Sequence, residues 1–185
     1  MPSDLGIALQ LVSITFMVPL GLSQAASVRV AGEAGRGRAA GIGLAARAAY
    51  LIAAAAAAIA SAVFFLLPEP LIRPFLDNNN PDAAAVIAVA VPLLFMAAIF
   101  QIFDTLQVAS SGNLRGLQDT KWPMVIAVIA YWPVGVGLAY LLGFKLGFGG
   151  VGVWGGLTVG LAVASAALTW RFVQRDRFGL LAASR

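Results

Sequence analysis

Long apolar runs with very few charges are the feature of this sequence that most restricts its fold. Five stretches, each long enough to cross a membrane as a helix, follow one another with short polar connections between them. A helix needs about 20 apolar residues to cross a bilayer, and a spanning segment must satisfy its backbone hydrogen bonds internally. Ala and Leu dominate and no strand-like alternation is present, so we expect helices. They are predicted at about residues 5–30, 39–67, 83–114, 123–144 and 148–174.

The composition agrees with a membrane setting. Of the 185 residues, 61% are hydrophobic and 11% are charged, whereas a soluble domain has roughly 45–50% apolar and about 25% charged residues. So few polar side chains could not cover a soluble core. We therefore expect an all-α integral membrane bundle of about five transmembrane helices. It would form a single transmembrane domain over residues 1–185, with the lipid bilayer as its surroundings.

Two residue types are missing, and their absence removes several kinds of chemistry. The sequence has no Cys and no His, so it offers no disulfide, thiol nucleophile, imidazole base or zinc site of the usual kind. We therefore expect neither an enzyme nor a bound cofactor. The net charge of +4 fits cytoplasmic membrane loops, which collect Lys and Arg, so no nucleic-acid partner is expected.

The cations are divided unevenly between the two ends of the predicted helices. Two of them, Arg73 and Lys145, would lie at one end. The other end would hold ten: Arg29, Arg36, Arg38, Arg47, Arg115, Lys121, Arg171, Arg175, Arg177 and Arg185. The positive-inside rule then predicts a multi-pass protein of the plasma (inner) membrane, with its N-terminus outside and its C-terminus in the cytoplasm. A chain that starts outside with an odd number of spans is expected to be truncated, or one half of something larger.

Asp104 is the only carboxylate inside a predicted span. A charge in the bilayer is costly, so intramembrane carboxylates usually face a cavity or a partner. Gln101, Gln107 and Ser111 recur around it at helical spacing, which predicts one polar face along the helix. We interpret these four residues as a cation-coupling and substrate-binding site. The alternative is that Asp104 is solvated near the helix end or bonded to a neighbouring helix.

Three further residues suggest function within the spans. Pro19 interrupts the first helix and predicts a kink, to which we assign a gating role; such prolines are also common in membrane helices without any such role. Tyr131 and Trp132 in the fourth span would form an aromatic pocket for organic cations through cation–π attraction. Ordinary helix packing is the alternative for this pair.

Other features are interpreted as structural. Arg115 and Asp119 flank a short loop, where they would cap helix ends or pair with each other. The last span contains glycines at the spacing that allows helices to pack closely, namely Gly152, Gly155, Gly156 and Gly160.

Several of these strings together resemble one family. The segment Gln101–Gln107, continuing through Ser111–Thr120, is similar to the tenth helix of the multidrug and toxic-compound extrusion (MATE) transporters and the loop after it. Three more helices of that family, the eighth, eleventh and twelfth, have similar segments here. These are Phe16–Gly21 with Ser27–Val30, Tyr131-Trp132 with Gly137–Tyr140, and Gly150–Trp154 with Gly156-Leu157. The chain thus resembles the last five of twelve helices, part of the C-terminal lobe.

The resemblance implies a function. MATE transporters export cationic or amphipathic drugs and toxic compounds in exchange for Na⁺ or H⁺. An acidic residue at the position of Asp104 takes part in cation coupling and substrate binding, so Na⁺ at Asp104 is the one metal ion expected. The expected partners are cationic small molecules and an N-terminal lobe on another chain, because no match to the first seven helices is present.

Two other functions stay open on the sequence alone. The chain could be a truncated, inactive or subunit-type membrane protein without independent transport. It could also be a related lipid-linked-sugar flippase. A membrane enzyme has little support, because the spans hold a single carboxylate and no second catalytic group beside it.

Overall fold

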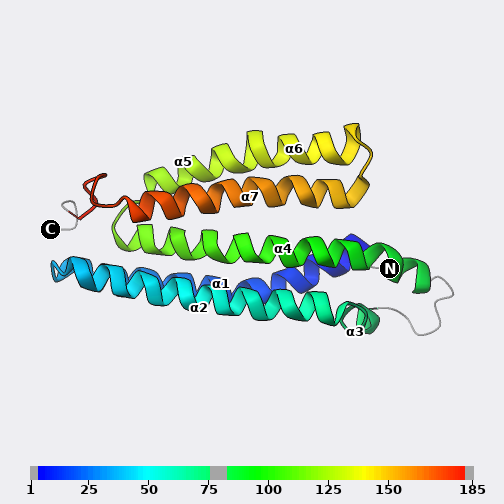
Figure 1. Ribbon diagram of the computed structural model, residues 1–185, viewed down its shortest axis with the longest axis horizontal. Helices are drawn as coiled ribbons and strands as arrows, with labels where there is room; N and C mark the ends of the chain where they lie inside the picture. Colours follow the sequence, from blue (N-terminus) through cyan, green and yellow to red (C-terminus); the bar gives the residue numbers. More distant parts are fainter. Residues whose placement is uncertain (1–3, 76–82, 182–185) are drawn as a thin grey trace.

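The computed structural model describes residues 4–75 and 83–181, with side chains for residues 17–74 and 84–181. Within these ranges the chain is helical and no strand occurs. The long helices run side by side along one axis of an elongated bundle (Figure 1). The predicted all-α fold class is confirmed.

The long helices lie at the positions of the apolar runs. α1 covers Asp4–Gly35, α2 covers Ala39–Leu66, α4 covers Ala83–Gly116 and α7 covers Gly149–Val173. A short helix α3, Pro68–Ile72, and the 3-10 turn η1, Arg73–Phe75, follow α2. The remaining long segment is one continuous helical rod made of α5 (Lys121–Ile129), η2 (Ala130–Val136), α6 (Gly137–Tyr140) and η3 (Leu141–Lys145).

Four helical segments in the described residues are long and apolar enough to cross a membrane: Ala39–Leu66, Ala84–Gly116, Lys121–Lys145 and Gly149–Val173. The first predicted span, residues 5–30, falls within α1, and α1 is not among these four. Side chains before Met17 lie outside the described residues. The fifth span therefore stays a prediction.

Helix α4 lies in the middle of the bundle. It packs against α1 and α2 on one side and against α7 on the other. The α5–η3 rod lies beyond α7 (Figure 1). A polar residue on α4 can therefore face either of two groups of helices.

Glycines allow α7 and the rod to approach closely. A Cβ added at Gly152 would lie 2.7 Å from the Leu142 carbonyl carbon, and one at Gly160 would lie 2.6 Å from the Gly135 Cα. A Cβ at Gly156 would collide with the backbone of Ala139. These contacts confirm the close-packing role for three of the four glycines. Gly155 differs, because a Cβ there would meet its nearest neighbour at an ordinary 3.7 Å.

The rod contains two π-helical stretches, η2 and η3. Pro133 lies inside η2. Because proline has no backbone N–H and its ring crowds the preceding turn, an α-helical hydrogen-bond pattern cannot continue unchanged through it. Single π turns occur often at functional sites, and η2 carries Tyr131 and Trp132.

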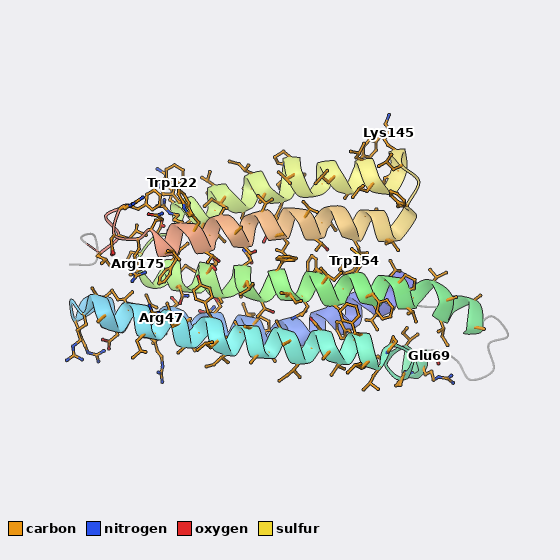
Figure 2. All side chains as sticks on the ribbon, in the orientation of Figure 1. Arg47, Glu69, Trp122, Lys145, Trp154 and Arg175 are labelled. Atoms are coloured by element: carbon orange, nitrogen blue, oxygen red, sulfur yellow. The ribbon has the colours of Figure 1, made fainter. Side chains whose placement is uncertain are left out.

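Most charged residues lie at one or the other end of the bundle. The α1–α2 and α4–α5 connections and the end of α7 lie at one end, whereas α3 and the η3–α7 connection lie at the other (Figure 1). Figure 2 shows Arg47, Trp122 and Arg175 at the first end and Glu69 and Lys145 at the second. We call the first of these the cationic end.

Candidate substrate and cation site

Asp104 is a buried carboxylate on the central helix. Its side chain lies on α4, and the residue is 7% exposed. Its Oδ2 atom has no hydrogen-bond partner among the described residues. Buried polar atoms are nearly always hydrogen-bonded, so an unpaired carboxylate oxygen inside a helical bundle suggests a place for a cation or a proton.

A cavity of about 260 Å³ lies against this carboxylate. It is formed where α4, η2 and α7 meet. Its lining residues are Phe100, Asp104, Tyr131, Trp132, Gly135, Val136, Leu157 and Leu161. The structure therefore brings Asp104, Tyr131 and Trp132 to one cavity, with a single negative group among aromatic and aliphatic side chains.

Gln101 lies against a different cavity. That cavity, of about 290 Å³, is lined by Val18, Pro19, Ala56, Ile59, Ala60, Gln101 and Thr105. It lies between α4, α1 and α2. Thr105 donates its hydroxyl to the Gln101 carbonyl oxygen at 2.8 Å. Pro19 and Gln101 are thus brought together, but apart from Asp104.

The separation has a simple geometric cause. Residues three apart on a helix differ by about 60° in direction. Because α4 has neighbours on both sides, this turn is enough to point Gln101 toward α1 and α2 and Asp104 toward α7 and η2. Gln107 and Ser111 are half-buried and line neither of the two cavities. The four polar residues do not form one site in the described structure.

Several cavity residues were not singled out by sequence reasoning. Phe100 is one helical turn before Asp104, so the spacing rule could have found it. Leu157 and Leu161 are also one turn apart, but nothing distinguishes them from other apolar residues of α7. Only the packing of α7 against α4 and η2 brings them to the carboxylate.

Two roles were predicted for Arg115 and Asp119, capping helix ends or pairing with each other, and the pairing does not occur. Arg171 Nε donates to Asp119 Oδ2 at 2.6 Å, and both side chains are buried. Arg115 instead donates to the Ser23 hydroxyl at 3.0 Å. The chain turns sharply after α4, where Gln118 has a φ of 62°, and this turn places Asp119 beside the end of α7.

Two aromatic rings lie against the arginine of this ion pair. The Arg171 guanidinium carbon lies 5.2 Å from the centre of the Trp122 ring and 4.7 Å from that of Phe178. These contacts join Arg171 on α7 to α5 and to the chain that follows α7. They belong to the cationic end and do not line the Asp104 cavity.

A cluster of hydrogen-bonded hydroxyl groups joins three helices. Ser110 on α4 is hydrogen-bonded to Tyr50 on α2 and to Thr169 on α7, each at 2.9 Å. Hydrogen bonds between membrane helices contribute about 0.6 kcal/mol on average. We regard this cluster as structural.

Acidic ligands are scarce around Asp104. Among the described residues, no group of three or more His, Cys, Asp or Glu side chains lies together. A sodium ion bound at Asp104 would therefore depend on neutral oxygens for its other ligands, and oxygen is the donor that hard cations prefer.

These features define a class of protein: a helical membrane bundle with one buried carboxylate beside an aromatic cavity. Comparison with known families is more specific. A model of the MatE family matches residues 3–141, so the chain belongs to this family, as the motifs around Asp104 had suggested.

Similarity to individual proteins supports the same family. The chain is 50% identical over 167 residues to a protein of Rhizobium meliloti (strain 1021) named "Probable multidrug resistance protein NorM", covering 90% of this chain and 36% of that protein. It is 41% identical over 177 residues to a protein of the same name from Deinococcus radiodurans, covering 94% of this chain and 38% of the relative. The chain thus spans just over a third of the length of these curated relatives.

A solved structure shows the same arrangement of helices. The crystal structure of the eukaryotic MATE transporter AtDTX14 superposes with a TM-score of 0.84 at 26% sequence identity. The match covers 98% of this chain and 40% of that transporter. The predicted MATE-type membrane bundle is confirmed.

Proposed function

We propose that this chain forms the cation- and substrate-binding part of a membrane antiporter that exports cationic or amphipathic drugs and toxic compounds in exchange for Na⁺ or H⁺. The observation that carries the proposal is the buried Asp104 carboxylate, with an unpaired Oδ2, against a cavity lined by Tyr131 and Trp132. The curated relatives are named as multidrug resistance proteins, which supports the same activity.

Different residues of the cavity would contribute different interactions to ligand binding. Asp104 supplies the negative charge, whose attraction for a cation is strong in surroundings of low dielectric constant. Tyr131 and Trp132 offer aromatic faces, which attract organic cations by about 0.5–2 kcal/mol each. The remaining lining is apolar and suits the hydrophobic part of an amphipathic compound.

A single carboxylate also explains exchange. One negative charge is neutralised by one cation, so binding of Na⁺ or H⁺ at Asp104 lowers the affinity of the cavity for an organic cation. Entry of the coupling ion from one side of the membrane then favours release of the drug on that side. The two ligands compete for one group, as an antiporter requires.

We further propose that the cationic end faces the cytoplasm of a bacterial inner membrane. Arg47 and Arg175 lie there, whereas Lys145 lies at the opposite end (Figure 2). The positive-inside rule favours this direction. Alternating access requires two units that move around a binding site, and we assign the second unit to the segment of the longer relatives that this chain does not cover.

Binding of ethidium, a fluorescent aromatic cation, tests the proposal on this chain directly. The chain is purified in detergent and titrated by fluorescence anisotropy, with Asp104→Asn as the test variant. We expect Asp104→Asn to weaken binding at least about 10-fold, because a cation loses its one buried counter-charge. Asp176→Asn makes the same chemical change at an exposed carboxylate and should bind like wild type. Equal affinities for Asp104→Asn and wild type would contradict the proposal.

A further inference from the structure

A groove separate from both cavities lies at the cationic end, between the last part of α1 and the first part of α2. Its volume is about 520 Å³. Its lining residues are Val28, Arg29, Gly32, Glu33, Arg36, Gly41, Leu44, Ala45 and Ala48. We call it the α1–α2 groove. The export function proposed above does not use it.

Small residues keep the groove open. A Cβ added at Gly32 would lie 3.4 Å from Arg36 Nη1, and one at Gly41 would collide with the Glu33 carboxylate. The Glu33 carboxylate therefore lies where a larger residue at position 41 would be, and a side chain added at position 32 would extend toward Arg36. The hollow is a consequence of the sequence, because glycine stands at both positions.

The charge of the groove is positive. Arg29 and Arg36 line it together with one acid, Glu33, and Arg36 donates to the Glu33 carboxylate at 3.1 Å. Glu33 is also the only acid between residues 29 and 47, a stretch with four arginines. One salt bridge therefore leaves Arg29 uncompensated within the groove, and an anion is the complementary ligand.

Exposed apolar side chains continue the groove toward the middle of the bundle. Val28 is 72% exposed and Leu44 is 71% exposed. Val28 precedes Arg29 by one residue on α1, and on α2 the apolar lining runs from Leu44 to Ala48, toward the middle of the bundle. A site with cations at the end of the bundle and apolar side chains beside them matches one lipid molecule, with its phosphate next to its acyl chain.

We propose that the α1–α2 groove binds an anionic phospholipid, with its phosphate on Arg29 and Arg36 and an acyl chain along Val28 and Leu44. Basic pockets between membrane helices are known to take anionic headgroups. A free anion would use the arginines but would gain nothing from the apolar side chains, so the lipid is the occupant that fits the whole groove.

Native mass spectrometry of the full chain in detergent tests this proposal. Palmitoyl-oleoyl phosphatidylglycerol is the probe and palmitoyl-oleoyl phosphatidylcholine the neutral comparison. We expect the first phosphatidylglycerol to bind more tightly than phosphatidylcholine. Arg29→Gln and Arg36→Gln should each weaken the binding of the first phosphatidylglycerol about five-fold. A basic residue at the membrane surface contributes about that factor to the affinity for an anionic lipid. Arg73→Gln removes an arginine with a similar salt bridge, to Glu69 at 3.1 Å, at the opposite end and should change nothing.

A second variant tests the shape of the groove independently of its charge. Gly32→Leu keeps every charge and fills the groove, and helix propensity favours the change, so circular dichroism should show a normal helix content. We expect it to remove the preference for phosphatidylglycerol. An unchanged preference in Gly32→Leu, or in a variant that carries both Arg29→Gln and Arg36→Gln, would overturn the proposal. So would displacement of the lipid by millimolar inorganic phosphate, or a groove closed by a second copy of the chain at every lipid concentration.

Discussion

Two buried carboxylates, one on α4 and one just after it, differ in whether their charge is paired. Asp119 is neutralised by Arg171, whose guanidinium is covered by Trp122 and Phe178. Asp104 has an oxygen with no partner in the described structure and faces a cavity. A paired carboxylate contributes to structure, whereas an unpaired one is available to a ligand. This difference leads us to place the site at Asp104.

Arg171→Gln is predicted to destabilise the chain by about 3–5 kcal/mol, because it leaves the Asp119 carboxylate buried without a counter-charge. Adding Asp119→Asn should restore much of the loss, since the buried charge is then gone as well. The measurement is the unfolding free energy in mixed micelles. Arg73→Gln breaks the exposed pair with Glu69 and should cost at most about 1 kcal/mol. A similar small loss for Arg171→Gln would show that the buried pair contributes little.

At the scale of helices, the close contact between α7 and the rod brings the cavity walls together. Gly156 and Gly160 on α7 meet Ala139 and Gly135 of the rod almost backbone to backbone. Leu157 and Leu161, the residues that follow these glycines, line the Asp104 cavity. The distance between η2 and α7 therefore depends on the small size of the glycines.

Gly156→Ala is predicted to push α7 away from α6, because the new methyl group would meet the Ala139 backbone. Overpacking of this kind costs about 1–3 kcal/mol. Gly155→Ala is the matched control, since its methyl group would make ordinary contacts and alanine favours helix by up to about 1 kcal/mol. Thermal unfolding followed by circular dichroism compares the two. Equal midpoints would contradict the assigned packing.

Sequence reasoning located the helices well because its signals there are local. The predicted helices at 39–67 and 148–174 correspond to Ala39–Leu66 and Gly149–Val173, since the length of an apolar run and its flanking turn residues are local properties. The π-helical form of η2 was not predicted. Pro133 indicates a disturbance, but its form depends on packing against α7.

The site was harder to predict for the same reason. A lone carboxylate in an apolar run indicates Asp104, and the adjacent aromatics indicate Tyr131 and Trp132. The polar spacing around Asp104 was less informative, because it does not tell which helices pack on each side of α4. That packing points Gln101 into the other cavity and sets Asp119 beside Arg171.

For the whole molecule, the α4 helix joins two groups of helices, and the hydrogen bonds of Ser110 to Tyr50 on α2 and to Thr169 on α7 link the same two groups. The fold matches a part of a MATE transporter, and the Asp104 cavity lies inside this part. The central claim is that one carboxylate holds either a coupling ion or a drug cation. Such competition has a stoichiometry that can be counted.

The most direct test counts the small cations released when the chain binds ethidium. The chain is loaded with Na⁺ at high pH or with H⁺ at low pH, and release is followed by a sodium electrode or a pH indicator. We predict about one Na⁺ or H⁺ released per ethidium bound by the wild type, as competition for a single charge requires, and none released by Asp104→Asn. Ethidium binding with no cation release by the wild type, or with the same release by Asp104→Asn, would contradict the account.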